Sequence, residues 1–372
     1  MSFTEAKRRD IKQYLLRKID DDDQAMMQKV SEEFGISHTS IKRYLEAESA
    51  EGHIMKSPDR LCGYSLIKRS VVRNYGIKDF LESDDYAAYN DFQSDLTVND
   101  NALKIWRYVL PEMFNNALEH SEGSLITVRA EMCTLYTEIA MTDDGVGIFR
   151  KIADGLMDYG YPHPSLEDAA TELYKGKFTT KPENHTGEGI FFSMHMLDRF
   201  AASSDGTLLR RGFPGVPSVV RSHLLAYAMK LTKKGTVVYM RLENDTRREI
   251  GKVLSRYADA DDGFIRTVIP VFEACHDCDP VGRSQARRLC TRLDGFKEAV
   301  FDFENVDIMG QGFADEVFRV YQNAHPKIKL SCVNMNTFVR TMYHHVINNK
   351  ITVPDFSDIV RAKNSESAGS DD

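Results

Sequence analysis

Three short polar segments, each beside a regular element, constrain the fold of this 372-residue chain more than any other feature. Residues 112–120 (EMFNNALEH) end an amphipathic helix that begins near Leu103. Residues 142–148 (TDDGVGI) directly follow a predicted strand, and residues 186–190 (TGEGI) precede a predicted helix. This order indicates a layered sheet with helices on one face. We expect strands at 125–130, 136–141, 206–211 and 235–242, and a helix at 188–200.

The first segment carries two side chains that suit chemistry at a phosphate. Glu112 and Asn116 are four positions apart, so one face of a helix presents both. A carboxylate can accept a proton from water, and an amide oxygen can bind a hard cation. The other interpretation is a polar helix face in solvent, and for Glu112 taken alone that interpretation is the better one.

In this order, the three segments resemble the N, G1 and G2 boxes of the GHKL family, which includes gyrase, histidine kinases and mismatch-repair ATPases. The resemblance implies a Bergerat α/β sandwich that binds ATP with Mg²⁺. In that family, the residue matching Glu112 polarises the attacking water, the one matching Asn116 ligates Mg²⁺, and the one matching Asp143 accepts a hydrogen bond from the adenine amino group. Alone, an Asp-Asp-Gly sequence after a strand is most often a turn.

The resemblance also assigns roles to glycines and to a lid. The glycines of the second box let the backbone approach the base, and those of the third lie at the hinge of a lid over the nucleotide, where a helix N-terminus favours phosphate. The polar stretch at about 149–186 is the expected lid. Lys181 reaches a phosphate in one interpretation and is a solvated lid charge in the other. The expected ATP-binding residues are Asn116, Asp143, Gly145, Gly147, Thr180, Lys181, Gly187 and Gly189.

The first 60 residues predict helices followed by a hairpin. Residues 24–34 have helical periodicity, Gly35 suits a helix C-cap, and Ser37 suits the N-cap of the next helix. This pattern resembles a winged helix-turn-helix, whose second helix would offer Thr39, Ser40, Lys42 and Arg43 to the DNA major groove. Additional phosphate contacts are expected from Arg60, Lys68, Arg69 and Arg73.

One observation weighs against the DNA interpretation, and one alternative to it stays open. The acidic run at residues 20–23 would repel a phosphate backbone if it faced one. The alternative is a three-helix module that binds protein.

Residues 61–100 carry no clear period, and we expect a linker with helices there.

The C-terminal portion resembles a STAS domain. A predicted strand at 299–303 leads through an acidic turn into a helix at 312–321, and a strand at 329–334 and a helix at 336–347 follow. Bacterial anti-anti-sigma factors of that fold are phosphorylated at a serine that begins this helix, and their kinases are small GHKL proteins. Here Gly310, Gln311 and Gly312 occupy the turn, so the usual hydroxyl is missing.

Composition limits the remaining classes. The net charge is -8 and the pI near 5.8, so nucleic acid would have to be bound by a local patch. No run of about 18 apolar residues is present, so we expect no membrane partner. Six scattered cysteines fit a reducing cytoplasm. Cys275 and Cys278 form half of a zinc site at most, because tetrahedral zinc needs two further ligands.

We therefore predict an α+β multidomain protein. It has a winged helix-turn-helix at 1–75, a GHKL domain at 76–245, a STAS-like α/β domain at 246–361 and a disordered tail at 362–372. The leading hypothesis is a cytoplasmic switch that binds ATP and Mg²⁺, hydrolyses ATP slowly, and couples nucleotide state to DNA or partner binding.

Two alternatives stay open. The chain is a serine/threonine kinase of the anti-sigma type acting on a separate STAS or sigma-regulatory partner, or a scaffold that keeps ATP as a structural ligand. In the leading hypothesis, closure of the lid changes how the GHKL domain packs on the STAS-like domain or on a second subunit of a homodimer. A sensor histidine kinase is disfavoured, because only His38 and His53 precede residue 101.

Overall fold

The computed structural model describes residues 3–80, 86–159, 161, 163–178, 187–213, 222–259 and 261–348. The chain divides into two compact units. The first unit comprises residues 1–151 and 192–253, and the second comprises 152–191 and 254–372. The predicted disordered tail at 362–372 lies outside the described residues.

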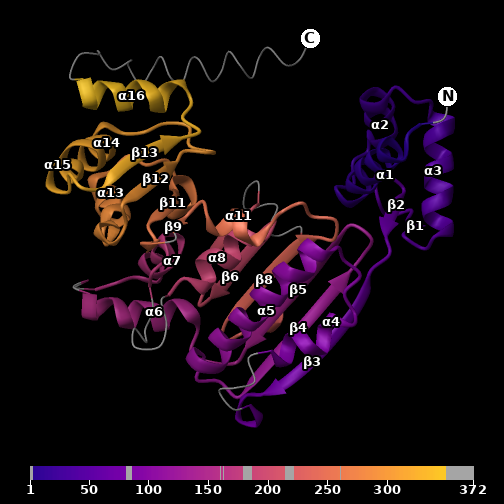
Figure 1. Ribbon diagram of the computed structural model, residues 1–372, viewed down its shortest axis with the longest axis horizontal. Helices are drawn as coiled ribbons and strands as arrows, with labels where there is room; N and C mark the ends of the chain where they lie inside the picture. The colour runs from indigo at the N-terminus through magenta and orange to yellow at the C-terminus, as the bar shows by residue number, and fades with distance from the viewer. Residues whose placement is uncertain are drawn as a thin grey trace. The chain divides into compact units, whose positions relative to one another are not determined.

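Three helices and a hairpin open the first unit: α1 (Glu5–Asp20), α2 (Met26–Phe34), α3 (His38–Ala50), β1 (Ile54–Lys56) and β2 (Tyr64–Leu66) (Figure 1). This confirms the predicted element order. Gly35 ends α2 with a φ of 63°, and Ser37 accepts a hydrogen bond from the Ser40 N–H at 3.2 Å, as expected for these caps. The core of these elements also includes Leu135 and Tyr136, from the strands that follow.

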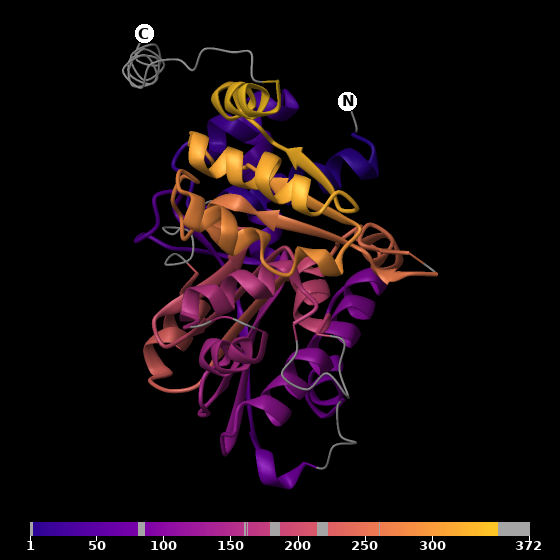
Figure 2. The ribbon, with the colours of Figure 1, turned by 90° about the vertical axis from the view of Figure 1, so that its left-hand side faces the viewer.

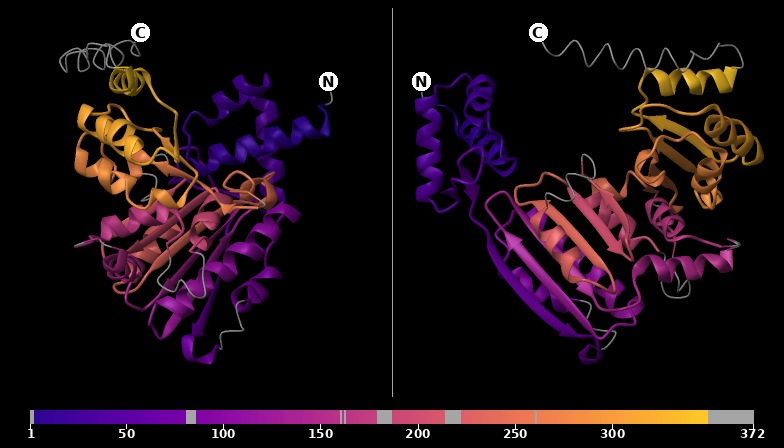
Figure 3. Two further views of the ribbon diagram at one scale, coloured as in Figure 1. Left: turned by 60° about the vertical axis from the view of Figure 1, so that its left-hand side comes forward. Right: turned by 180° about the vertical axis from the view of Figure 1, so that it is seen from behind.

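A six-stranded sheet forms the rest of the first unit, in the order β3-β4-β5-β8-β6-β7 (Figure 3). Its neighbouring strands are all antiparallel. The strands are β3 (Arg69–Gly76), β4 (Leu125–Met132), β5 (Tyr136–Asp143), β6 (Arg199–Ser204), β7 (Thr207–Arg211) and β8 (Val237–Glu243).

Three sequence-based expectations were wrong in this unit. The segment 61–100 is not only a linker with helices, because β3 pairs with β4 over its whole length. The boundary predicted at residue 75 therefore falls inside the sheet. The helix expected at 188–200 ends earlier, as α8 (Gly189–Met196), and β6 follows directly.

Both faces of this sheet carry a helix, although helices were expected on one face only. The Tyr75 ring contacts Phe114 of α5 (Asp100–His120) at 5.1 Å, and cross-strand pairing places Ile126 and Asp143 on that same face. Ala140 is three residues from Asp143 and so points to the opposite face, where it packs against α10 (His223–Leu231). The remaining elements of the unit are η1 (Ile77–Asp79), α4 (Ala87–Gln93) and most of α11 (Ile250–Leu254).

The second unit contains a parallel sheet of β11 (Arg266–Pro270), β12 (Glu298–Asp302) and β13 (Lys329–Val333). Figure 2 shows its orange and yellow strands against helices of similar colour. After β11 come α12 (Val271–Ala274), α13 (Arg283–Cys290), η3 (Leu293–Gly295), α14 (Gln311–Asp315), a π-helical turn (Glu316–Tyr321), α15 (Gln322–Ala324) and α16 (Thr337–Asn348). A short hairpin of β9 (Ala258–Asp259) and β10 (Gly263–Phe264) precedes them.

The predicted lid differs most from expectation. Its described part is helical: α6 (Ile148–Leu156), η2 (Met157–Tyr159) and α7 (Leu166–Lys175). Residues 152–191 also belong to the second unit, with the C-terminal sheet, rather than to the domain predicted at 76–245. A capping box at Ser165 and Asp168 starts α7, and its last residues are buried.

Among the described residues, no helix is both long and apolar enough to cross a bilayer.

Candidate functional site

A buried carboxylate at the end of β5 is the centre of the candidate site. The Asp143 side chain is 8% exposed, and its Oδ1 accepts hydrogen bonds from the Gly145 N–H at 2.9 Å and the Thr236 N–H at 3.2 Å. Burial raises the pKa of Asp143, and the two backbone donors oppose that shift. The Thr236 side chain also hydrogen-bonds the Asp143 carboxylate and opposes the shift. Because an ionised carboxylate offers about four lone-pair sites, it can still accept a further bond from a ligand.

Two residues before β8 complete this environment, and sequence reasoning did not single them out. The Thr236 hydroxyl accepts a hydrogen bond from the Ile148 N–H at 3.0 Å. Gly235 has a φ of +95°, and a Cβ there would overlap the Asp143 carbonyl. The available signal was a Gly-Thr pair directly before a predicted strand, but its partner lies 93 positions earlier in the chain.

Replacing Gly235 with alanine is therefore expected to lower the free energy of unfolding by more than the matched change Gly206→Ala. Both glycines have positive φ, but a Cβ at Gly206 meets no atom within 4 Å. Gly206→Ala should cost about 1 kcal/mol from backbone conformation alone. Urea denaturation of the two variants measures the difference, and equal losses would contradict the packing described around Asp143.

The second box is joined to the end of the helix that carries the first box. The Val146 N–H donates to the Ser121 carbonyl at 2.8 Å, and a Cβ on Gly145 would overlap that carbonyl. Asp144 accepts from the Ser124 N–H at 2.6 Å and the Ser124 hydroxyl at 2.5 Å, bonds that lower its pKa to about 2. Two of the three boxes are thus adjacent in space.

Gly147 closes the loop on its other side. It has a φ of +90°, and a Cβ there would lie 2.6 Å from the Asp205 carboxylate. Phe149, two residues after Gly147, donates its N–H to the Ser204 hydroxyl at 3.3 Å. The ends of β5, β6 and β8 therefore hold the glycine loop, residues 143–147, in place. A side chain at Gly145 or Gly147 would prevent these close contacts.

Glu112 and Asn116 lie one turn apart on α5, as predicted, and both are partly exposed. Between them, Met113 and Phe114 point into the core. Asp143 lies on the sheet face that α5 covers, so the three side chains belong to the same side of the sheet.

The third box belongs to the second unit. Gly187 has a φ of 72°, and its backbone packs on that of Phe178. Gly189 begins α8. Thr180 and Lys181 lie outside the described residues.

On α3, the expected DNA-contacting side chains are accessible. Thr39, Lys42 and Arg43 are exposed and Ser40 is half-buried, while Ile41 and Leu45 fill the core. The helix therefore presents one polar face with two cations.

Each of the four cations expected to add phosphate contacts has an acidic or carbonyl partner within the chain. Arg60 donates to the Ile19 and Asp20 carbonyls, and Lys68 pairs with Glu131 and Glu138. Arg69 and Arg73 both pair with Asp95.

The acidic run at residues 20–23 is likewise engaged. Asp20 accepts hydrogen bonds from Tyr136 and Arg241, Asp22 pairs with Arg60, and Asp23 pairs with two lysines. These partners remove much of the repulsion expected from the run.

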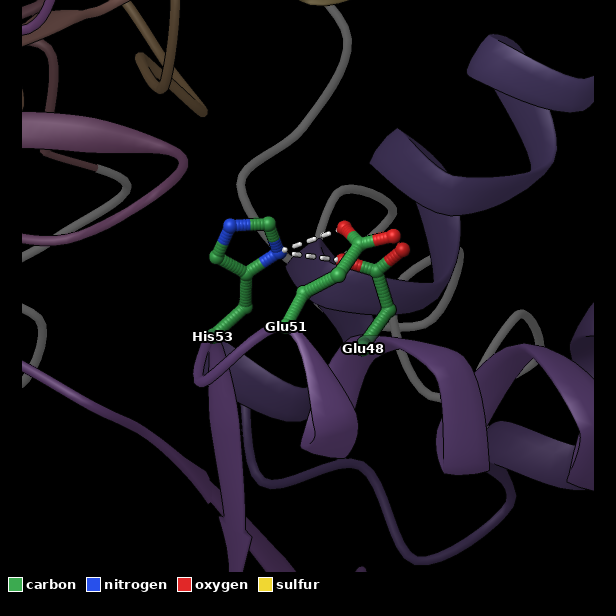
Figure 4. A group of neighbouring side chains, drawn as sticks. All are labelled: Glu48, Glu51 and His53. Carbon is green, nitrogen blue, oxygen red and sulfur yellow. Dashed lines mark hydrogen bonds and ion pairs between the residues drawn. The ribbon is translucent and has the colours of Figure 1, made fainter.

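Among the described residues, one group has side chains placed closely enough to hold a metal ion: Glu48, Glu51 and His53, at the end of α3 (Figure 4). The Lys12 ammonium lies 2.6 Å from Glu48 and 3.5 Å from Glu51, so a cation already balances these carboxylates. The His53 ring lies 2.7 Å from Glu48. We interpret the group as a structural ion cluster.

The two cysteines of the pair differ in burial. Cys275 is 3% exposed, and burial raises its pKa to about 12, whereas Cys278 is exposed. His276 is engaged by Arg288 at 2.9 Å. In the described part of the chain these residues do not form a metal-binding group.

Comparison with known families supports one part of this picture. Residues 285–339 match the family described as a STAS-like domain of unknown function (DUF4325). The match runs from α13 into α16 and includes β12 and β13. No curated protein matches the chain. The chain therefore contains a C-terminal STAS-like domain within a mixed α/β protein.

Proposed function

We propose that this protein is an ATP-binding regulatory switch of the GHKL type. The observation that carries the proposal is the Asp143 carboxylate, which is buried, held at Oδ1 by two backbone donors, and left with lone pairs for a further bond. A buried acceptor held in this way suits the exocyclic amine of a purine, because a ligand without that amine would leave the acceptor unpaired. The glycine loop beside it is held in place by close contacts, because a Cβ at Gly145 or Gly147 would overlap neighbouring atoms.

The phosphate side of the proposal rests on α5. Asn116 supplies an amide oxygen for Mg²⁺, and Glu112 supplies a carboxylate one turn away. Magnesium would neutralise phosphate charge, and Glu112 would orient and deprotonate a water. The phosphate contacts that the resemblance assigns to Gly187 and Gly189 stay a prediction.

Calorimetric titration of the full chain with a non-hydrolysable ATP analogue and Mg²⁺ tests this function. We expect saturable binding of one analogue per chain. The absence of binding to the folded wild type would refute the proposal.

Glu112→Gln is expected to abolish ATP hydrolysis while leaving analogue affinity within a factor of about three. The amide keeps the size and polarity of the carboxylate but cannot accept a proton from water. Phosphate release under single-turnover conditions measures the change, and Glu119→Gln on the same helix is a matched control. Unchanged phosphate release in Glu112→Gln would mean that another group activates the water.

The downstream role is proposed from the flanking modules. The exposed cations of α3 support DNA binding, and the STAS-like domain supports a regulatory partner of that fold. ATP alters either contact only if it binds two conformations with different affinity. DNA retention measured with and without the analogue tests the coupling. Transfer of labelled γ-phosphate to a STAS protein would instead favour the kinase alternative.

A further inference from the structure

One arginine of the STAS-like region contacts the segment that leads into the third box. Arg292 lies inside the matched residues 285–339 and has left-handed backbone, with a φ of 59°. Its guanidinium donates to Glu172 of α7 at 3.0 Å and to the Lys177 carbonyl at 3.0 Å. These bonds connect it to the last turn of α7 and to the second residue after that helix.

The same guanidinium lies over two aromatic rings. Its central carbon is 4.6 Å from the centre of the Tyr159 ring and 5.1 Å from the centre of the Phe178 ring, and the two rings contact each other at 5.7 Å. Phe178 is buried. A planar cation over aromatic faces adds electrostatic attraction to the hydrogen bonds.

The backbone of Phe178 in turn packs directly on Gly187. A Cβ at Gly187 would overlap the Phe178 backbone, so the two backbone segments are in close contact there. Gly187 is the first glycine of the third box, and α8 begins two residues later. A continuous set of contacts therefore runs from Arg292 through Phe178 to Gly187.

Buried hydrogen bonds and an ion pair surround this set of contacts. Lys175 is 1% exposed and donates to Glu172 at 2.6 Å and to the carbonyls of Arg288 and Thr291 at 2.8 and 2.9 Å. Glu172 also accepts from the Tyr161 hydroxyl at 2.7 Å. Because Glu172 is fully engaged and buried, it holds the Arg292 guanidinium in one position.

We infer that Arg292 is a positioning residue for the third box, through which the STAS-like domain sets the backbone position of Gly187. The inference rests on the proposed ATP-binding function. It names the residue through which a partner bound to the STAS-like domain would change phosphate affinity. Movement of the 288–292 segment would move Phe178, and with it Gly187.

The test compares Arg292→Ala, Arg292→Lys and the matched control Arg288→Ala in the full chain. Arg288 contacts Asp168 of α7 but is not among the groups that touch Phe178. Each variant is titrated with adenosine and with a non-hydrolysable ATP analogue plus Mg²⁺. Adenosine carries no phosphate, so a loss of affinity confined to the analogue reports contacts to the phosphates.

Arg292→Ala is expected to weaken analogue binding about tenfold, equivalent to the loss of one charge-assisted hydrogen bond, with adenosine affinity unchanged. Arg292→Lys should recover part of the loss, because it retains a charge for Glu172 but not the planar face. Equal weakening of both ligands, no weakening of either, or the same loss in Arg288→Ala would overturn the assignment.

A second measurement needs no nucleotide. Amide hydrogen exchange at residues 187–191 should be faster in Arg292→Ala than in the wild type, and unchanged exchange would overturn the inference. If the wild type binds neither ligand, the proposed function fails, whereas the exchange result still decides whether Arg292 positions the third box.

Discussion

Replacing Arg241 with methionine is expected to lower the free energy of unfolding by about 3 kcal/mol, because it leaves the half-buried Asp20 carboxylate without its charged partner. Arg241 donates to Asp20 of α1 at 2.9 Å and lies 3.5 Å from Glu138 on the neighbouring strand. Its guanidinium also covers the Tyr136 ring at 3.4 Å. Lys68 still pairs with Glu138 in the variant, which keeps the loss at the lower end for a broken buried pair.

Urea denaturation followed by the fluorescence of Trp106, the single tryptophan and a buried residue of α5, reports this unit specifically. The matched control is Arg17→Ala, which removes an exposed pair with Glu243 and should cost less than about 1 kcal/mol. Adding Asp20→Asn to Arg241→Met should restore part of the loss. Similar losses in the Arg241 and Arg17 variants would contradict the role given to Arg241.

The same pair predicts a pH dependence. Burial alone would raise the pKa of Asp20, but Arg241 and the Tyr136 hydroxyl outweigh it and the pKa is lowered from its ordinary 3.8. The stability contributed by Asp20 is thus fully present above pH 3.8 and is lost as the pH falls below that value. The difference between wild type and Arg241→Met should shrink over that range.

Asp143→Asn is expected to weaken binding of the ATP analogue by about 100-fold or more, with little change in stability. The amide oxygen can still accept from Gly145 and Thr236, but the amide nitrogen then occupies the position of Oδ2. A donor would face the donor of the adenine amine. Because the size of the side chain is unchanged, the packing of the loop should be retained.

The neighbouring carboxylate supplies the control for this experiment. Asp144 is bonded to Ser124 and Leu125 rather than directed at a ligand, so Asp144→Asn should change analogue affinity by less than a factor of about three. Calorimetry on both variants measures the contrast. Equal affinities in the two variants would remove Asp143 from the proposed site.

Local signals made several elements predictable. Gly35 and Ser37 determine the turn between α2 and α3, because a single residue is enough to form a left-handed C-cap or a hydroxyl N-cap. Alternation in β4 and β5 was equally local. The order of helices and strands after residue 283 followed for the same reason.

Long-range pairings were not predictable in this way. Thr236 contacts Asp143 across 93 positions, and Arg241 contacts Asp20 across 221 positions. The sequence around one residue of each pair does not indicate the other. Strand β3 was missed because its burial alternates weakly on an edge strand. The polar sequence of residues 149–186 led us to expect a lid without regular structure. Helix α7 forms there because the buried Lys175 donates to the carbonyls of Arg288 and Thr291, which lie more than 100 positions later.

The central claim is that the Asp143 loop of the first unit binds the nucleotide. Amide hydrogen exchange of the full chain, with and without the ATP analogue and Mg²⁺, tests it most directly. We predict slower exchange at residues 143–149 and at Thr236, where backbone N–H groups surround the carboxylate. Binding of the analogue with unchanged exchange in these residues would contradict the claim.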